Sequence, residues 1–332
     1  MIGISELPVF RITERDVAIL RAIARYRFLT AELVHRIVGG SERGVRNRLR
    51  NLGALAYLVR LQGLVTEPCA YGLGNRGARL LSDCGVEIND KLDWAAKNDT
   101  TRHFLAHTLA VAEAMLHFQA AAEIDALCLT DHDDLLRDMP EPTRMARYPF
   151  CMRVTVRLGA EVMSIPAVPD RLFSLRYHDG TRHNFALELD RGTMDIWANR
   201  LAHKSSFRRK LIAYCSARQE KRHTQLWGFN SFRVLTVTTG EERIRNMIEA
   251  QRRVAPECPP GFFLYSTMER LTRHGALGPA WVTTKGDHVS LRHDGHARVA
   301  ELVTPMSADD TAPSLRAAGV KRRSTGTTRA LA

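Results

Sequence analysis

The first eighty residues carry the pattern that most constrains the fold. Apolar residues recur in three groups at the three-to-four-residue spacing of amphipathic helices, namely Val17, Leu20 and Ile23, then Leu33, Val34 and Ile37, then Val45, Leu49 and Leu52. Thr13, Thr30 and Ser41 stand where side chains cap helix N-termini. The segment therefore predicts three short helices, with a tight Gly39-Gly40 turn between the second and the third.

Two short apolar runs follow within residues 54–74, around a connection that contains Gly and Pro, and residues 75–85 are typical of a further helix. The whole arrangement resembles a bacterial winged helix-turn-helix, whose third helix can lie in the major groove of DNA. Three amphipathic helices alone would also suit a small oligomerisation module, but the added pair of strands favours DNA binding. The polar positions of the third helix are the candidate contacts to double-stranded DNA: Ser41, Arg43, Arg46, Asn47 and Arg50.

The charge of the chain agrees with a polyanionic partner. Forty-eight Lys and Arg against 36 Asp and Glu give a net charge of +12 and a pI near 9.8. A basic protein of an arginine-rich genome would show the same excess without binding nucleic acid. No apolar run approaches a membrane span, and the start lacks a secretion signal, so we expect a soluble, cytoplasmic protein without a membrane partner.

Metal-ligating patterns are sparse. The six cysteines are scattered without paired spacing, so we expect free thiols, no disulfide and no structural zinc. His103 and His107 lie four residues apart on an expected long helix, and without a third ligand type nearby they are interpreted as packed imidazoles rather than a metal site.

The pattern changes after residue 100, where a long helix is followed by short apolar runs that are typical of strands. A second long helix is expected over residues 193–220, and then a strand, a helix and two final strands. This order predicts an α/β sandwich and, for the whole chain, an α/β (α+β) class. The expected organisation is a winged helix at residues 1–84, a linker at 85–100, an α/β domain at 101–300 and a disordered tail at 301–332.

Three carboxylates gather at the ends of two expected strands. Asp170 follows Pro169 at the start of one strand, and Glu188 and Asp190 lie at the end of its hairpin partner. Because side chains alternate along a strand, Glu188 and Asp190 share a face. Like charges this close require a cation, and Mg²⁺, which prefers hard oxygen ligands, is the expected one.

The Pro169-Asp170 pair and the triplet at residues 188–190 resemble the PD-(D/E)xK restriction-endonuclease-like superfamily, although Asp190 stands where lysine is usual. In some members the following helix supplies the lysine, and Lys204 and Lys210 are the candidates. Together with "ELDRGT", "HTLAVAEAML" and the N-terminal winged helix, "KLIAY" at residues 210–214 resembles more closely the replication-relaxation family of bacterial plasmids and mobile elements. Its KLxxY pattern ranks Lys210 above Lys204.

The resemblance, over roughly residues 12–250, implies a nuclease-like fold and involvement in plasmid replication and DNA relaxation. In the expected site Asp170 and Glu188 bind Mg²⁺, Asp190 assists as ligand or base, and Lys210 stabilises developing charge. Arg208 and Arg209 lie on a basic helix beside the carboxylates and are expected to hold the DNA backbone.

Alternative functions stay open at this point. The chain could nick DNA with Mg²⁺, or it could be a non-catalytic regulator of replication or transcription with a degenerate nuclease fold, or a scaffold for a protein partner. In a purely structural role, Asp170 would cap a turn, and Glu188 and Asp190 would pair with arginines such as Arg171, Arg191 and Arg208. No pattern in the sequence fixes an oligomeric state.

Overall fold

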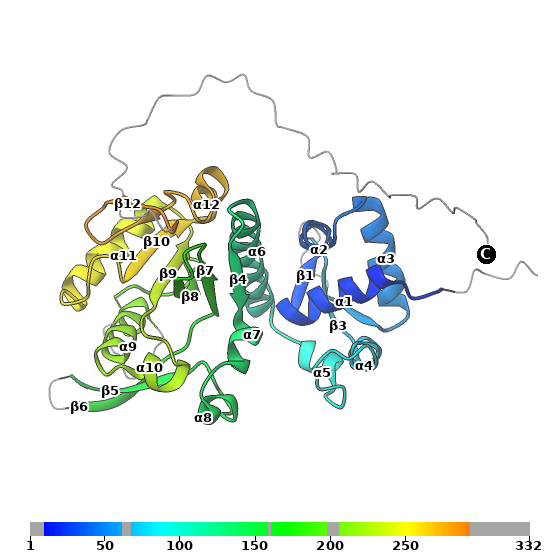
Figure 1. Cartoon of the computed structure of the whole chain (residues 1–332), viewed down its shortest axis with the longest axis horizontal. Coiled ribbons are helices and arrows are strands. Elements are labelled where there is room, and N and C mark those ends of the chain that lie inside the picture. The colour runs from blue at the N-terminus through cyan, green and yellow to red at the C-terminus, as the bar shows by residue number, and fades with distance from the viewer. Residues whose placement is uncertain (1–9, 62–67, 159–160, 198–205, 293–332) are drawn as a thin grey trace, which may run out of the picture. The chain divides into compact units, whose positions relative to one another are not determined.

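Helices and strands combine into a mixed α/β fold in the part of the chain that the computed structural model describes, which is residues 10–61, 68–158, 161–197 and 206–292 (Figure 1). The N-terminal elements are α1 (Glu14–Tyr26), β1 (Phe28–Thr30), α2 (Ala31–Val38), α3 (Glu42–Ala54), β2 (Leu58–Leu61), β3 (Ala70–Leu73), α4 (Asn75–Asp83) and α5 (Trp94–Asn98).

Local capping explains where the first three helices begin. The Thr13 side chain accepts from the backbone of Asp16, whose carboxylate accepts from the Thr13 backbone in return. At α2 and α3 the Thr30 and Ser41 side chains accept from the backbone N–H groups of Leu33 and Gly44. Between α2 and α3, Gly39 and Gly40 have φ values of 67° and 81°, a region that favours glycine. The three predicted helices are confirmed.

The expected pair of strands after α3 is also confirmed as β2 and β3, an antiparallel pair that forms the β2–β3 hairpin. Residues 62–67 between the two strands lie outside the described part of the chain. β1 pairs with β3 and completes a three-stranded sheet that the sequence did not predict. The order of elements in this part of the chain is therefore helix, strand, two helices and a pair of antiparallel strands.

The segment expected to be a linker carries a packed helix. Within α5 the side chain of Trp94 is buried, and the Asn98 amide donates to the carbonyl oxygen of Leu73 on β3 at 2.8 Å. A helix bonded in this way to the N-terminal sheet is an ordered extension of the N-terminal elements.

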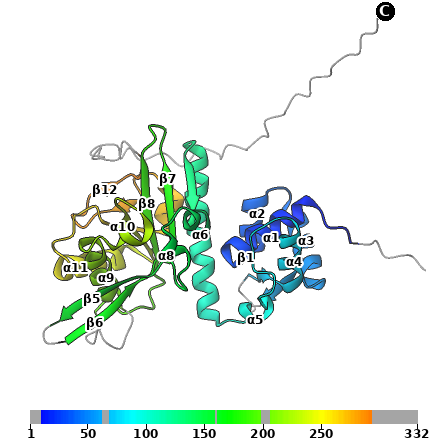
Figure 2. The same ribbon diagram turned by 60° about the horizontal axis from the view of Figure 1, so that its bottom comes forward.

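The remaining elements build a sheet covered by helices on both faces (Figures 1 and 2). They are α6 (Arg102–Ile124), β4 (Cys128–Asp131), α7 (His132–Arg137), α8 (Glu141–Arg144), β5 (Met152–Leu158), β6 (Glu161–Ala167), β7 (Arg171–Arg176), β8 (Arg182–Leu189), α9 (Phe207–Gln219), α10 (Arg222–Trp227), β9 (Arg233–Thr238), α11 (Glu241–Val254), β10 (Phe263–Thr267), α12 (Met268–His274), β11 (Trp281–Val282) and β12 (His288–Val289).

The large sheet has seven strands in the order β12-β11-β10-β9-β8-β7-β4, and β8, β9 and β10 run parallel. α6 packs on one face, where Phe118 contacts Phe173 and Trp281. α9 and α11 cover the other face, where Leu211 and Met247 share a core with strand residues. The predicted α/β sandwich is therefore confirmed. The β5–β6 hairpin forms a separate two-stranded sheet that contacts α9 (Figure 2).

α6 is a shared element, since it contacts β1 and α2 as well as β4 and β8. All described residues fall within one unit, residues 1–298. The expected tail at residues 301–332 lies outside the described residues. No helix among the described residues has the length and apolarity needed to cross a bilayer.

The helix predicted for residues 193–220 is wrong at residues 193–197, and residues 198–205 lie outside the described part of the chain. The described residues before the gap at 198–205 have no helical structure, and α9 begins at Phe207. Its first N–H groups donate to the carbonyl oxygens of Asp195 and Ile196, and Ser206 caps the helix. These bonds satisfy the first backbone N–H groups of α9 with partners outside the helix, so no preceding helical turn is needed.

Two further sequence expectations fail. Residues 278–284 were expected to form the last strand, but β12 follows them and pairs with β11. The expectation of free thiols is also wrong for Cys215 and Cys258, whose sulfur atoms are joined at 2.09 Å. The partners are 43 residues apart, and neither position has a sequence pattern that pairs it with the other.

Candidate functional site

Glu188 lies at the centre of a buried polar cluster, at the C-terminal end of the internal strand β8 of the large sheet. It occupies the end of β8, where only 3% of its surface is exposed. Its neighbours Leu187 and Leu189 belong to the core beneath α6, so alternation turns Glu188 towards α9. The antiparallel partner β7 brings Asp170 alongside, since the Asp170 N–H donates to the Leu187 carbonyl oxygen at 3.0 Å.

α9 supplies two donors to the Glu188 carboxylate. Lys210 Nζ bonds Oε2, and the Tyr214 hydroxyl donates to Oε1 at 2.5 Å. The two side chains are four residues apart and therefore lie on one side of the helix. Leu211 between them is fully buried in the core beneath α9. This geometry explains the KLxxY spacing, because the lysine and the tyrosine form hydrogen bonds to the same carboxylate and the leucine packs in the core.

Asp170 is held from two other directions. His107 Nε2 on α6 donates to Oδ1 at 3.0 Å, and the Leu189 backbone N–H donates to Oδ2 at 2.7 Å. His107 is thus part of the cluster, which the sequence did not predict. Its partner is 63 residues away along the chain, so no local pattern could have revealed the contact.

The charges of the cluster shift one another's ionisation. Burial and the charge of Asp170 raise the pKa of Glu188 to about 7, against the opposing influence of Lys210 and Tyr214. Burial opposes ionisation of Asp170, but the bond from His107 and the charge of Lys210 outweigh it and lower its pKa. Burial also disfavours the Lys210 ammonium, but Glu188 and Asp170 outweigh it and raise the pKa of Lys210. At neutral pH Lys210 is charged and Asp170 is an anion.

Asp190 does not join the other two carboxylates. Both of its oxygens bond the Arg243 guanidinium, and Oδ2 also accepts from Thr238 at 2.6 Å. Asp190 is thus bonded by other groups than Asp170 and Glu188 are, although its charge also helps to raise the pKa of Lys210. In a purely structural role Asp190 was expected to pair with an arginine such as Arg171 or Arg191, and it pairs instead with Arg243. Arg171 bonds Asp131, and Arg191 donates to the His103 carbonyl oxygen.

The basic residues predicted near the site divide into two groups. Lys204 lies outside the described residues. Arg209 and Lys210, with Pro166, Val168 and Ser206, line a hollow of about 320 Å³ that reaches the carboxylate cluster through Lys210. Arg208 faces a different hollow on the outer side of α9. The hollow at Lys210 is a place where a phosphate could meet the cluster.

The donor set at this edge suits a small hard cation. Each oxygen of Asp170 and Glu188 already accepts one hydrogen bond, and a carboxylate oxygen has a second acceptor direction. Mg²⁺ commonly uses one or two carboxylates and keeps several waters. Among the described residues, the group of three possible ligands is instead Cys215, Glu257 and Cys258, but its two sulfurs are bonded to each other and cannot both serve as thiolates.

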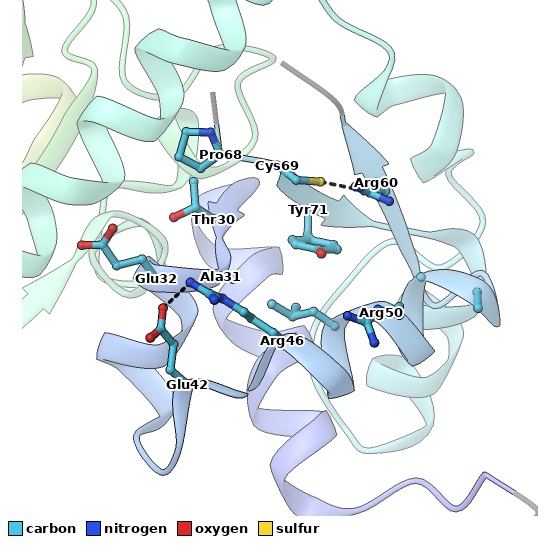
Figure 3. A pocket seen from close by; sticks show the side chains of 13 residues that line it. Thr30, Ala31, Glu32, Glu42, Arg46, Arg50, Arg60, Pro68, Cys69 and Tyr71 are labelled. Atoms are coloured by element: carbon cyan, nitrogen blue, oxygen red, sulfur yellow. Dashed lines mark hydrogen bonds and ion pairs between the residues drawn. The ribbon is translucent and has the colours of Figure 1, made fainter. Parts of the chain in front are cut away.

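A second candidate site is the surface of α3 and the β2–β3 hairpin. Arg43, Arg46, Asn47 and Arg50 are exposed on α3, opposite its buried residues. Ser41 caps the helix. Arg46 and Arg50 line a hollow of about 650 Å³ together with Arg60 and Tyr71 of the hairpin, as Figure 3 shows.

The hairpin contacts were not predicted. Arg60 and Tyr71 are register partners on β2 and β3, so the two side chains share the face that meets α3. Arg60 Nε lies 3.0 Å from the Cys69 sulfur, and Arg46 pairs with Glu42 one turn away on α3 (Figure 3). The alternation of residues 58–61 was the only signal that could have placed Arg60 outward. Together these side chains form an exposed basic surface that a polyanion could contact.

No curated protein and no solved structure matches the chain. A family model described as replication-relaxation matches residues 20–227, which span the N-terminal helices, the hairpin with Asp170 and Glu188, and the KLxxY segment of α9. The match covers more than half of the chain and agrees with the resemblance that the sequence motifs indicated. The chain belongs to the replication-relaxation family.

Proposed function

We propose that this protein binds double-stranded DNA through α3 and the β2–β3 hairpin and nicks it at the cluster of Asp170, Glu188 and Lys210 with Mg²⁺. The observation that carries the proposal is the bond from Lys210 Nζ to Glu188 beside Asp170. In the nuclease pattern that the sequence resembles, a lysine accompanies the two acids, and α9 provides here the lysine that position 190 lacks.

Each residue of the cluster has a role that its geometry supports. Asp170 and Glu188 would hold the ion, and Mg²⁺ when bound supplies positive charge that polarises a phosphodiester and makes water a better nucleophile. The Lys210 ammonium, at the wall of the neighbouring hollow, donates to a phosphate oxygen and offsets charge that develops there. His107 and the Leu189 N–H fix the orientation of Asp170. Asp190 has an anchoring role through Arg243.

The DNA-binding part of the proposal is supported by the exposed arginines of α3. Arg46 and Arg50 project into a concave surface rather than into the core, so they can reach phosphates or guanine edges without a cost in packing. A net charge of +12 would draw the duplex towards the protein and make affinity fall with salt.

A second candidate, a non-catalytic DNA-binding regulator, is favoured by one observation. The polar groups of the cluster already satisfy one another, because Glu188 is bonded by Lys210 and Tyr214 and Asp170 by His107 and Leu189. A cluster that is neutralised from within can persist for structural reasons. This candidate predicts DNA binding that EDTA leaves unchanged and no cleavage.

The test is the conversion of supercoiled plasmid to nicked circles with Mg²⁺. Asp170→Asn and Glu188→Gln keep the shape of the side chain but remove its negative charge and one acceptor oxygen, and each should slow nicking by about a hundredfold or more. Glu269→Gln is the matched control, because Glu269 is an exposed acid paired with Arg273 on α12. Thermal melting confirms that each variant folds. Equal nicking by Asp170→Asn and the wild type rejects the catalytic assignment, and absence of nicking in all proteins with DNA binding intact supports the regulator.

A further inference from the structure

The outer side of α9 carries a hollow that the proposed nicking reaction does not use. Arg208, Ile212 and Ser216 line it at four-residue spacing, whereas Lys210 and Tyr214 fall on the opposite side of the helix towards Glu188. The hollow has a volume of about 680 Å³, is open to solvent, and is bordered by β5 and by the end of α11. It is therefore separate from the carboxylate cluster but on the same helix.

Three arginines from three elements face this hollow: Arg157 of β5, Arg208 of α9 and Arg253 of α11. Arg208 Nε is buried and has no hydrogen-bond partner within the described part of the chain. The acidic residue of the lining, Glu220, is already bonded to Arg222 at 2.9 Å. Arg253 is paired with Glu249, but no ion pair of Arg157 or Arg208 is found among the described residues. This excess of positive charge indicates that the hollow takes an anionic ligand.

Trp197 adds an aromatic surface to this basic hollow. It is 38% exposed, whereas Trp94, Trp227 and Trp281 are 8%, 1% and 0% exposed. The Arg253 guanidinium lies 5.3 Å from its ring centroid, a distance at which a cation holds an aromatic ring. The backbone N–H of Trp197 also donates to Asp195 Oδ1 at 2.9 Å. An exposed large aromatic side chain fixed at its backbone and its ring is suited to stacking.

A row of arginines beside an exposed tryptophan matches the chemistry of an unpaired nucleotide strand, which offers phosphates to guanidinium groups and base faces to aromatic rings. In a duplex the bases stack on one another, and their faces are not available to a protein side chain. The combination therefore favours a single strand over a duplex.

We propose that the hollow formed by Arg157, Trp197, Arg208 and Arg253 binds single-stranded DNA. The inference rests on the proposed function for the origin of that strand, because a nick next to Lys210 would create a strand end beside α9, and the bases at such an end can unpair. Arg208 and Arg209 lie on different sides of α9. Arg209 lines the hollow next to the carboxylate cluster, and Arg208 lines the hollow on the outer side of the helix.

The test measures binding of the full chain to oligothymidylate of about 15 nucleotides, the scale of single-strand sites, in EDTA. Tryptophan emission should be quenched, because Trp197 is the exposed indole, and anisotropy of a labelled oligonucleotide should report affinity independently. Trp197→Leu should abolish the quenching and weaken affinity about tenfold. Trp197→Phe, which keeps a stacking surface, should retain most of the affinity.

Arg253 and Arg273 offer a matched pair of variants. Each is exposed, with 64% and 67% of its side chain accessible, and each pairs with a glutamate four residues earlier. Arg253→Ala should weaken binding of the oligonucleotide several-fold and Arg273→Ala should not. Equal effects of these two variants, or unchanged affinity in Trp197→Leu, would overturn the proposal. The proposal would also be overturned if an unlabelled duplex displaced the labelled oligonucleotide as effectively as an unlabelled single strand does.

The same measurements separate this proposal from the proposed function. Oligothymidylate binding should persist in Asp170→Asn, which removes nicking, and in the double variant Arg46→Ala with Arg50→Ala, which weakens duplex binding. Loss of oligonucleotide affinity in the Arg46 and Arg50 variant with none in Trp197→Leu would assign the single strand to α3 and reject the hollow, whatever the outcome of the nicking assay.

Discussion

The surface of α3 and the carboxylate cluster hold their charges in opposite ways. On α3, Arg46 is 62% exposed and its partner Glu42 is 51% exposed. In the cluster, the side chain of Glu188 is 4% exposed and that of Lys210 is 28% exposed, and the two are bonded to each other. Exposed charges remain available to an external ligand and contribute little to stability. Buried charges are fixed in place, and the loss of one leaves its partners unpaired.

The largest effect on stability should come from Lys210→Met. The change leaves the Glu188 carboxylate buried with only Tyr214 as donor, and we expect the free energy of unfolding to fall by about 4 kcal/mol. Urea denaturation followed by circular dichroism measures it. The double variant with Glu188→Gln should recover much of the loss, because the uncompensated charge is gone. A loss below about 1 kcal/mol in Lys210→Met would mean that the cluster behaves like a surface ion pair.

Asp131 should show a slightly smaller effect that depends on pH. Arg171 bonds both of its oxygens, at 2.9 and 2.8 Å, and Arg25 bonds one at 2.7 Å. Burial opposes its ionisation, but the two arginines outweigh burial and hold the pKa of Asp131 below its ordinary value of 3.8. A lowered pKa stabilises the fold above the unfolded value, and this contribution is lost as the pH falls through the folded value.

Asp131→Asn should therefore lower the free energy of unfolding by about 3 kcal/mol at neutral pH, and the difference from the wild type should shrink below pH 3.8. Urea melts of both proteins across this pH range provide the measurement. A difference that stays constant down to acid pH would show that the lost contribution is packing rather than charge.

A change at the cap of α3 should have an intermediate effect. The Ser41 hydroxyl accepts from the Gly44 N–H at 3.2 Å, so Ser41→Ala should cost about 1 kcal/mol of stability, and Ser41→Gly only a few tenths. Thermal denaturation compares the two. If both variants bind duplex DNA as the wild type does, Ser41 serves α3 as a cap and not as a DNA contact.

The smallest effect on stability should come from Arg46→Ala combined with Arg50→Ala. Because both side chains are exposed, the free energy of unfolding should change by no more than about 0.5 kcal/mol. Duplex DNA affinity should fall, and the slope of its logarithm against the logarithm of salt should decrease by about 2. Unchanged affinity in fluorescence anisotropy would remove α3 from the DNA contact.

The two regions also differ in how far sequence could predict them. Thr13, Thr30 and Ser41 predicted three helix starts because a cap bonds a backbone group only a few residues away. The hairpin that joins Asp170 to Glu188 was predictable because its turn and alternation are local. The helix expected from residue 193 was not correct, since the carbonyl groups of Asp195 and Ile196 bond the first turn of α9 and periodicity does not reveal such a bond.

The partners of the cluster depend on contacts between distant parts of the chain. His107 reaches Asp170 across 63 residues and Arg243 reaches Asp190 across 53. Neither pairing follows from spacing, because strand order and the placement of α6 and α11 determine it. Lys210 was identified from its family resemblance, and the structure adds the physical reason, which is that Lys210 and Tyr214 bond one carboxylate.

The central claim is that Asp170 and Glu188, assisted by Lys210, hold a divalent metal ion for cleavage of DNA. The most direct measurement is anomalous diffraction from crystals of the full chain soaked with Mn²⁺, which shares the ligand preferences of Mg²⁺. We predict a peak about 2.1 Å from oxygens of both carboxylates, absent in Asp170→Asn. Crystals in which Lys210 remains on Glu188 and no anomalous peak lies near either carboxylate would contradict the claim.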